Sequence, residues 1–372
     1  MELSPEIIYL ITGYVPDKVD LCSLCQVSRN FRAAAERVLY STLALTNPVQ
    51  TRDACRMLAD SPRLSNVILS LSITLEQESD ASDEPSIPPD YWDSISQCLR
   101  MTTRLRSLNI NVENGDGLKK SWILNGVTFQ LQIFRWDLAW DADLVTFLIS
   151  QSRLVDLYIA DFNDDLPENE LITSNSLRQA STLPMLSSLE CTFSEAVGIL
   201  VPGRPVTHVK SCFSRSEQNE KRAEMAVLMS NLRLATKPLR SLNISDGSYR
   251  GDFSLEFLTN IVTAFTPAVE LRYLGALALP VDGDERLRFY GQLRRLRHLQ
   301  CVEFDLSEWD PAPTMPAALR ALARELHLYC ASIDTVVFIY EFEPFVVKAS
   351  GGIWSLEDPM TAEPANLWKE WR

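Results

Sequence analysis

The chain has 372 residues, of which 46% are apolar and 23% charged, and both values are ordinary for a soluble globular protein. This length allows a small module plus one large domain, or two domains. The formal net charge is −14, and because phosphate binding needs clustered Lys and Arg, this balance argues against nucleic acid as the principal partner.

Residues 3–40 are predicted to form three short helices. Ser4 can cap the first helix, with Pro5 at its first position, while Asp17 and Ser28 can cap the second and third. The third helix has apolar residues at 31, 34, 35, 38 and 39, which is the stripe of an amphipathic helix. About 40 residues bury too little surface to be stable alone. Their surplus apolar surface must therefore be covered by the rest of the chain or by another protein.

One ordered series of residues runs through this segment. It consists of Leu3, Pro5-Glu6-Ile7-Ile8, Asp20-Leu21, Leu24, Val27-Ser28-Arg29, Phe31-Arg32 and Leu39-Tyr40. The series resembles an F-box, the adaptor-binding module of Skp–cullin–F-box ubiquitin ligases. Two departures are visible, because Ser4 separates the usual leucine and proline and Phe31 stands where tryptophan is commoner. The alternative is a three-helix cap that covers one end of the main domain.

A phrase of the form L-x-x-L-x-apolar recurs beyond residue 45. Its copies begin at positions 64, 105, 128, 154, 186, 206, 239, 271, 296 and 333. The spacing is irregular but brackets the period of leucine-rich repeats. Between the copies, helical patterns are predicted over 141–152, 216–234, 254–265, 284–296 and 317–328.

This alternation predicts an α/β fold in two domains. The first, residues 1–45, is the F-box-like helical module. The second, residues 46–372, is an irregular leucine-rich-repeat-like βα solenoid, whose repeated strand–helix units form a parallel sheet with helices on one side. Residues 76–90 hold six acids, three prolines and no base, and are expected to form a solvated loop. The tail from Gly351 holds Trp354, Trp368 and Trp371, and we expect it to cap the last repeat.

Motifs for catalysis and metal binding are absent from the sequence. It contains no dinucleotide or P-loop glycine motif, no nucleophile elbow and no H-E-x-x-H. Among eight scattered cysteines, Cys22 and Cys25 form the one close pair, and we expect both to be reduced core residues on a helix. Because these motifs are missing, we predict no enzyme activity, no metal and no cofactor. A hydrolase or transferase whose catalytic residues are dispersed along the sequence is a weaker alternative.

The N-terminus has no basic segment followed by an apolar run and cleavage site, so no secretory signal is predicted. The longest charge-free apolar stretch, residues 64–75, is too short to span a bilayer. We expect a cytoplasmic or nuclear protein without a membrane partner.

Polar residues between the apolar strand positions should point onto the concave sheet face. We expect a protein target to bind there, through Asn109, Tyr158, Glu190, Lys210, Asn243 and Gln300. The F-box resemblance implies that the Skp adaptor, and through it a cullin, binds at Leu3, Pro5, Ile8, Leu21, Leu24, Val27 and Phe31. The chain is then similar to divergent fungal F-box proteins, and the implied function is substrate recognition in an E3 ubiquitin ligase. The alternative is a non-ligase interaction scaffold.

Overall fold

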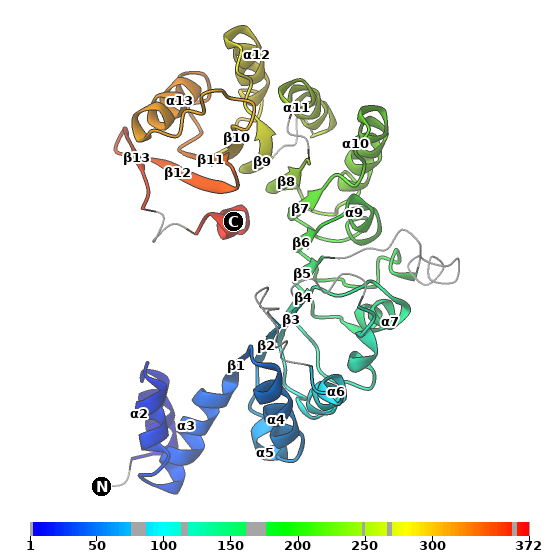
Figure 1. The fold of residues 1–372 in the computed structure, drawn as a ribbon, viewed down its shortest axis with the longest axis vertical. Helices are drawn as coiled ribbons and strands as arrows, with labels where there is room; N and C mark the ends of the chain where they lie inside the picture. Colours follow the sequence, from blue (N-terminus) through cyan, green and yellow to red (C-terminus); the bar gives the residue numbers. More distant parts are fainter. Residues whose placement is uncertain are drawn as a thin grey trace, which may run out of the picture. The chain divides into compact units, whose positions relative to one another are not determined.

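A computed structural model of the protein describes residues 3–75, 87–112, 118–160, 176–247, 250–265, 270–358 and 363–371 (Figure 1). The chain divides into two compact units, Met1–Leu177 with Ser181–Leu183 as unit 1, and Arg178–Ala180 with Pro184–Arg372 as unit 2. The compact units therefore do not separate at residue 45. Most of the expected acidic loop, residues 76–86, lies outside the described residues.

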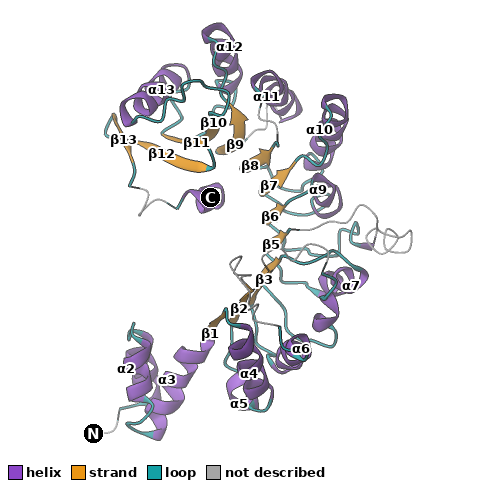
Figure 2. Cartoon of the chain, viewed as in Figure 1, coloured by secondary structure: helices purple, strands orange, loops and turns teal. Residues whose placement is uncertain are grey.

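Unit 1 begins with three helices and continues as strands that alternate with helices. The helices and one 3-10 turn are α1 (Pro5–Gly13), α2 (Lys18–Leu24), α3 (Arg29–Ser41), α4 (Pro48–Ala59), α5 (Pro62–Ser65), α6 (Tyr91–Met101), η1 (Ser121–Leu124) and α7 (Ala142–Ser150). The strands are β1 (Thr42–Leu45), β2 (Ser70–Leu75), β3 (Ser107–Val112), β4 (Ile133–Trp136) and β5 (Asp156–Ile159). Each strand pairs in parallel with the next, and α4 to α7 lie on one side of this sheet (Figure 2).

The core of unit 1 lies between the sheet and those helices. Leu108, Phe134 and Leu157 occupy matching register positions on β3, β4 and β5, and all three are completely buried. The opposite side of the sheet, which we call the helix-free face, carries the alternate residues of each strand.

Two of the three side-chain caps predicted for the opening helices are present, whereas the Ser4 side chain makes no cap hydrogen bond to α1. The Asp17 carboxylate accepts a hydrogen bond from the Val19 backbone N–H at 2.8 Å, and the Ser28 hydroxyl accepts one from Phe31 at 3.3 Å. These contacts satisfy backbone donors that have no partner within the helix.

Unit 2 repeats the same strand–helix alternation. Its strands are β6 (Ser188–Cys191), β7 (His208–Cys212), β8 (Ser241–Ser245), β9 (Tyr273–Ala278), β10 (Cys301–Asp305), β11 (Thr335–Tyr340), β12 (Glu343–Ser350) and β13 (Ile353–Leu356). Its helices are α9 (Ser194–Leu200), α10 (Gln218–Leu232), α11 (Gly251–Phe265), α12 (Gly283–Leu293), α13 (Pro316–Tyr329), η2 (Pro364–Asn366) and α14 (Leu367–Glu370). Strands β6 to β11 pair in parallel, whereas β12 and β13 continue the sheet antiparallel.

Six of the ten predicted strand phrases are in register and three are displaced; the phrase from 271 is in register at Leu274, but a bulge puts Leu277 rather than Ala276 opposite Phe304. The phrase predicted from position 296 starts at Leu299 instead, because Val302 and Phe304 are the residues that face the helices and align with Val336 and Phe338 of β11. The copies predicted from 64 and 128 are displaced in the same way and begin at 68 and 131, so that β2 and β4 bury Leu71, Ile73, Phe134 and Trp136. In two of these copies a leucine, Leu64 or Leu296, stands four or three residues before the true start and imitates the first position of the phrase, whereas the copy from 128 begins with Thr128.

The expected C-terminal cap is made by one part of the tail. The β12–β13 hairpin adds to the edge of β11, and Trp354 of β13 stands edge-on to His327 of α13, with ring centroids 5.5 Å apart. The rest of the tail lies elsewhere: α14 contacts β7, β8 and β9, on the side away from α10 and α11 (Figure 1).

Candidate protein-interaction surfaces

The first candidate surface lies on the helical module, α1 to α3. Helices α1 and α2 both pack on α3, and the interior of the module contains Ile8, Leu21, Ala34 and Ala35. Ile8 and Leu21 are only 4% and 3% exposed. These two predicted adaptor-binding residues therefore form the core of the module in this conformation, and other side chains cover its outside.

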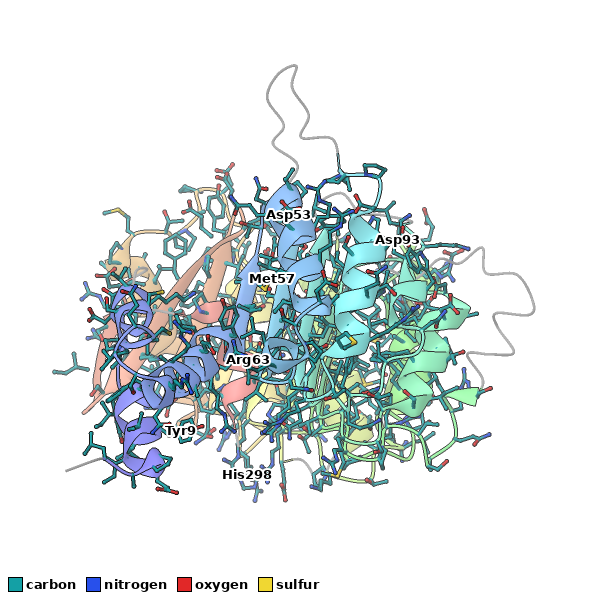
Figure 3. All side chains as sticks on the ribbon, turned by 90° about the horizontal axis from the view of Figure 1, so that it is seen from below. Tyr9, Asp53, Met57, Arg63, Asp93 and His298 are labelled. Carbon is teal, nitrogen blue, oxygen red and sulfur yellow. The ribbon has the colours of Figure 1, made fainter. Side chains whose placement is uncertain are left out.

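Large apolar side chains remain exposed on the outside of the module. They are Leu3, Ile7, Tyr9, Leu10, Ile11, Tyr14, Val19 and Val27. Leu10 is 64% exposed and Tyr14 81%, and Figure 3 shows Tyr9 among the side chains of α1. Among the predicted adaptor-binding residues, Leu3, Pro5 and Val27 are exposed, and Leu24 and Phe31 are half-buried. We call the eight exposed apolar residues, Leu3, Ile7, Tyr9, Leu10, Ile11, Tyr14, Val19 and Val27, the module patch.

Six members of the module patch were missed by the sequence reasoning: Ile7, Tyr9, Leu10, Ile11, Tyr14 and Val19. A signal for the first four exists in the sequence of α1, PEIIYLITG, which carries apolar residues around its whole circumference. A helix of that kind is expected to be covered on every side, whereas α1 packs mainly on α3.

The cysteine pair does not behave as predicted. Cys22 is exposed and Cys25 only partly buried, because Leu21 supplies the buried face of α2. The expectation that both thiols are core residues is therefore wrong. All eight cysteines are free, and five of them are buried.

The module is attached to the repeats through α3, which runs directly into β1. Arg63 of α5 forms an ion pair with Glu36 of α3, and Figure 3 labels Arg63 near this junction. The Arg63 side chain is 68% exposed, so this pair contributes little to stability.

The second candidate surface is the helix-free face of the sheet. In unit 1, Asn109 and Tyr158 lie on this face, on either side of Arg135 in the strand register. The Asn109 amide donates to the Ser72 hydroxyl at 2.9 Å, and the Arg135 guanidinium lies 5.9 Å from the centre of the Tyr158 ring. All of these side chains are half-buried, so they offer a polar, partly aromatic surface.

In unit 2, the helix-free face is covered by the chain's own tail. Glu190, Lys210 and Asn243 occupy one register row on β6, β7 and β8. Lys210 Nζ lies 3.1 Å from one Glu190 oxygen, and Lys369 Nζ of α14 lies 3.8 Å from the other. Asn243 is only 3% exposed. The three residues are on the predicted face, but α14 occupies the space in which a target would bind.

Gln300 was predicted to bind a target from the helix-free face, but the strand register shows that it is not part of that row. It precedes β10, where its backbone N–H bonds to Arg272 and its carbonyl accepts from residues 334 and 335. Cys301 and Glu303 take the positions on the helix-free face, because Val302 and Phe304 point to the core.

Glu303 organises a polar network on this face. The Tyr273 hydroxyl donates to one Glu303 oxygen at 2.6 Å, and the Asn243 amide donates to the other at 3.3 Å. Burial, followed by the nearby Glu303 carboxylate, raises the pKa of Tyr273 well above its usual value. The Tyr273 hydroxyl therefore keeps its proton and remains a donor at neutral pH.

Within the described residues, no three or more His, Cys, Asp or Glu side chains come together in a way that could hold a metal ion. The same residues contain no helix that is long and apolar enough to cross a membrane.

Comparisons with known proteins found similar chains among solved structures. No family model matches the chain, and a search of curated proteins found no match. Among solved structures, the chain is similar to the leucine-rich repeat-containing protein LegL7 from Legionella pneumophila, at 16% sequence identity. The match covers 88% of this chain and 95% of that one, with a TM-score of 0.46.

Proposed function

We propose that this chain is a non-catalytic receptor that links two proteins, one bound at the module patch and one at the helix-free face of the repeats. In the specific form of the proposal, the first partner is a Skp-type adaptor and the second is a ubiquitination target. The chemistry would then belong to other subunits of the ligase, and the receptor would act by raising the local concentration of its target.

The observation that carries the proposal is the module patch. Eight large apolar side chains within the first 27 residues are exposed. On a monomeric protein, exposed apolar side chains usually occur singly, and a group of them marks a binding site. The ordered series that resembles an F-box runs through the same helices. A Skp-type adaptor is therefore the partner that best fits this surface.

The competing function is a non-ligase scaffold in which the module only closes the end of the repeats. The continuity of α3 with β1 and the Arg63–Glu36 ion pair favour this alternative, because a cap must be fixed to the unit it covers. A cap alone, however, gives no role to the outward-facing residues of α1.

Co-expression with a Skp-type adaptor separates the two functions. A receptor gains solubility and retains the adaptor through purification, whereas a scaffold does neither. Pro5 is exposed, so Pro5→Arg should abolish retention of the adaptor while the repeats stay folded, as judged by circular dichroism. Retention of the adaptor by this variant would contradict the assignment of Pro5 as a contact.

A further inference from the structure

The tail segment around α14 sits on unit 2 as a bound peptide would. Leu367 and Trp368 are 4% and 2% exposed. They join a buried apolar cluster with Tyr273, Cys301, Val337 and Val346, and Trp371 packs against it partly buried. The cluster gathers residues of four strands, β9 to β12, beneath a helix of a single turn.

A polar contact holds the segment at Trp371. The His208 ring nitrogen Nε2 lies 3.0 Å from the Trp371 carbonyl oxygen. Since that oxygen only accepts, Nε2 carries the proton and donates it. At the other ring nitrogen, Nδ1 lies 2.8 Å from the Thr207 hydroxyl, which fixes the orientation of the imidazole. A main-chain carbonyl is recognised here, and any residue in place of Trp371 would supply it.

Charge complements this backbone contact. Glu190 is held between Lys210 at 3.1 Å and Lys369 of the tail at 3.8 Å, and the Lys369 ammonium also lies 4.9 Å from the centre of the Trp368 ring. The Glu190 side chain is 16% exposed, so its attraction for a cation is only partly screened by water.

The fit between the tail and the face leaves some buried polar atoms without partners among the described residues. These are Trp371 Nε1, Asn243 Oδ1, Ser188 Oγ and Ser241 Oγ, which lie on the tail and on the strands β6 and β8. An unsatisfied buried polar group is costly, typically about 1–3 kcal/mol. A partner that satisfied these atoms would gain an advantage over the tail.

We propose that the helix-free face of unit 2 is a peptide-binding site that the chain's own C-terminal segment occupies in cis. The partner that fits is a protein segment with bulky aromatic residues at i and i+3 and a lysine or arginine at i+1, as in Trp368-Lys369-Glu370-Trp371. The apolar cluster receives the first aromatic residue, Glu190 pairs with the base, and His208 binds the main chain. This inference deepens the proposed function, because it specifies the chemistry of the target that the repeats recognise.

The test measures binding of a fluorescein-labelled peptide, residues 363–372, to the full chain and to its variants by fluorescence anisotropy. The wild type should bind weakly, since the tail competes at an effective concentration of about 1 mM. Trp368→Ala, which removes the main anchor of the tail, should bind the peptide about tenfold more tightly than the wild type. Adding Glu190→Gln in that background should lower the affinity again severalfold.

Two further variants keep the test decisive. Lys369→Glu weakens the tail without opening the apolar cluster, and should raise peptide affinity severalfold even if Trp368→Ala proves unstable. Phe342→Ala changes an aromatic residue of unit 2 that is 97% exposed, and should bind like the wild type. If no variant binds the peptide, or if all bind it equally, the inference is overturned. No adaptor is present in this assay, so its failure is distinguishable from failure of adaptor binding.

Discussion

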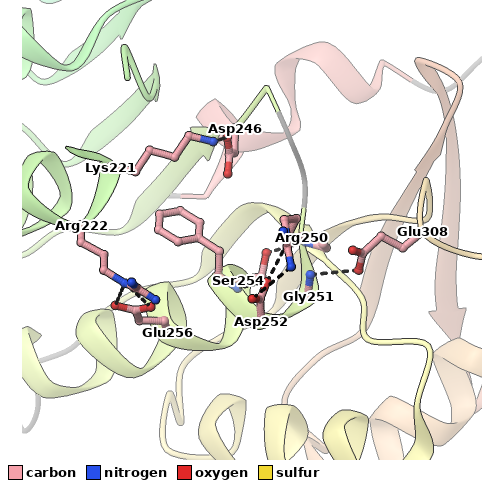
Figure 4. A network of polar contacts seen from close by, with 11 residues as sticks. Lys221, Arg222, Asp246, Arg250, Gly251, Asp252, Ser254, Glu256 and Glu308 are labelled. Carbon is pink, nitrogen blue, oxygen red and sulfur yellow. Dashed lines mark hydrogen bonds and ion pairs between the residues drawn. The ribbon is translucent and has the colours of Figure 1, made fainter. Parts of the chain in front are cut away.

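Replacement of Lys221 by methionine tests how unit 2 holds its buried charges. Lys221 of α10 forms an ion pair with Asp246, just after β8, and the two side chains are only 6% and 7% exposed (Figure 4). The ammonium also lies 5.7 Å from the centre of the Phe253 ring. Methionine keeps most of the volume of the lysine stem but leaves the Asp246 carboxylate without its ammonium partner. Removing one member of a buried pair costs about 3–5 kcal/mol of the free energy of unfolding.

The assay is urea unfolding at pH 7, followed by circular dichroism and tryptophan fluorescence. Combining Lys221→Met with Asp246→Ala should recover much of the loss, because no charge then remains buried. The control is Arg250→Met, which breaks a pair with Asp252 whose side chains are 62% and 55% exposed; Figure 4 shows both pairs. This control should change stability by less than about 1 kcal/mol. A loss below about 1 kcal/mol for Lys221→Met, or a double variant less stable than the single one, would refute the reasoning.

Two further predictions concern close packing and alkaline pH. A Cβ added at Gly275 would lie 2.5 Å from Nδ2 of Asn243 and 2.9 Å from Cε1 of Tyr273, so Gly275→Ala should destabilise the chain by about 1–3 kcal/mol; Gly291→Ala, in a helix and with nothing within 4 Å, should instead stabilise it by up to about 1 kcal/mol. A melting temperature of Gly275→Ala equal to that of the wild type would contradict the register at this site. Burial raises the pKa of the Cys191 thiol from 9.0 to about 12, so the unfolded chain loses this proton first and stability should fall by about 1.4 kcal/mol per pH unit between these two values. Cys191→Ala should make that slope shallower in urea titrations, and an unchanged slope would exclude Cys191 as a contributor.

Local patterns in the sequence predicted much of the fold. The caps at Asp17 and Ser28 and the strand phrases from 105, 154 and 239 depend on neighbouring residues alone, and the structure contains them. The displaced phrase from 296 shows the limit of such patterns. Leu296 and Leu299 are both buried, and only pairing with β9 and β11 identifies Leu299 as the first position of the strand.

The candidate site was less predictable, because its contacts join distant parts of the chain. The aromatic tail could be recognised as a segment that needs burial, but Trp371 meets His208, which precedes it by 163 residues. No local pattern specifies that pairing. Likewise, the amphipathic stripe of α3 indicated its buried side, whereas the apolar circumference of α1 left open which residues face outward.

The central claim is that the module patch binds an adaptor, and titration calorimetry of the purified chain with a Skp-type adaptor tests it most directly. We predict one adaptor per chain, and an affinity about 30-fold lower for Leu10→Glu, since a central apolar contact is worth about 2 kcal/mol. The matched control is Leu328→Glu, which makes the same change at a leucine of α13 that is 82% exposed, and it should bind like the wild type. Absence of binding by the wild-type chain, or equal affinities for Leu10→Glu and Leu328→Glu, would contradict the receptor function.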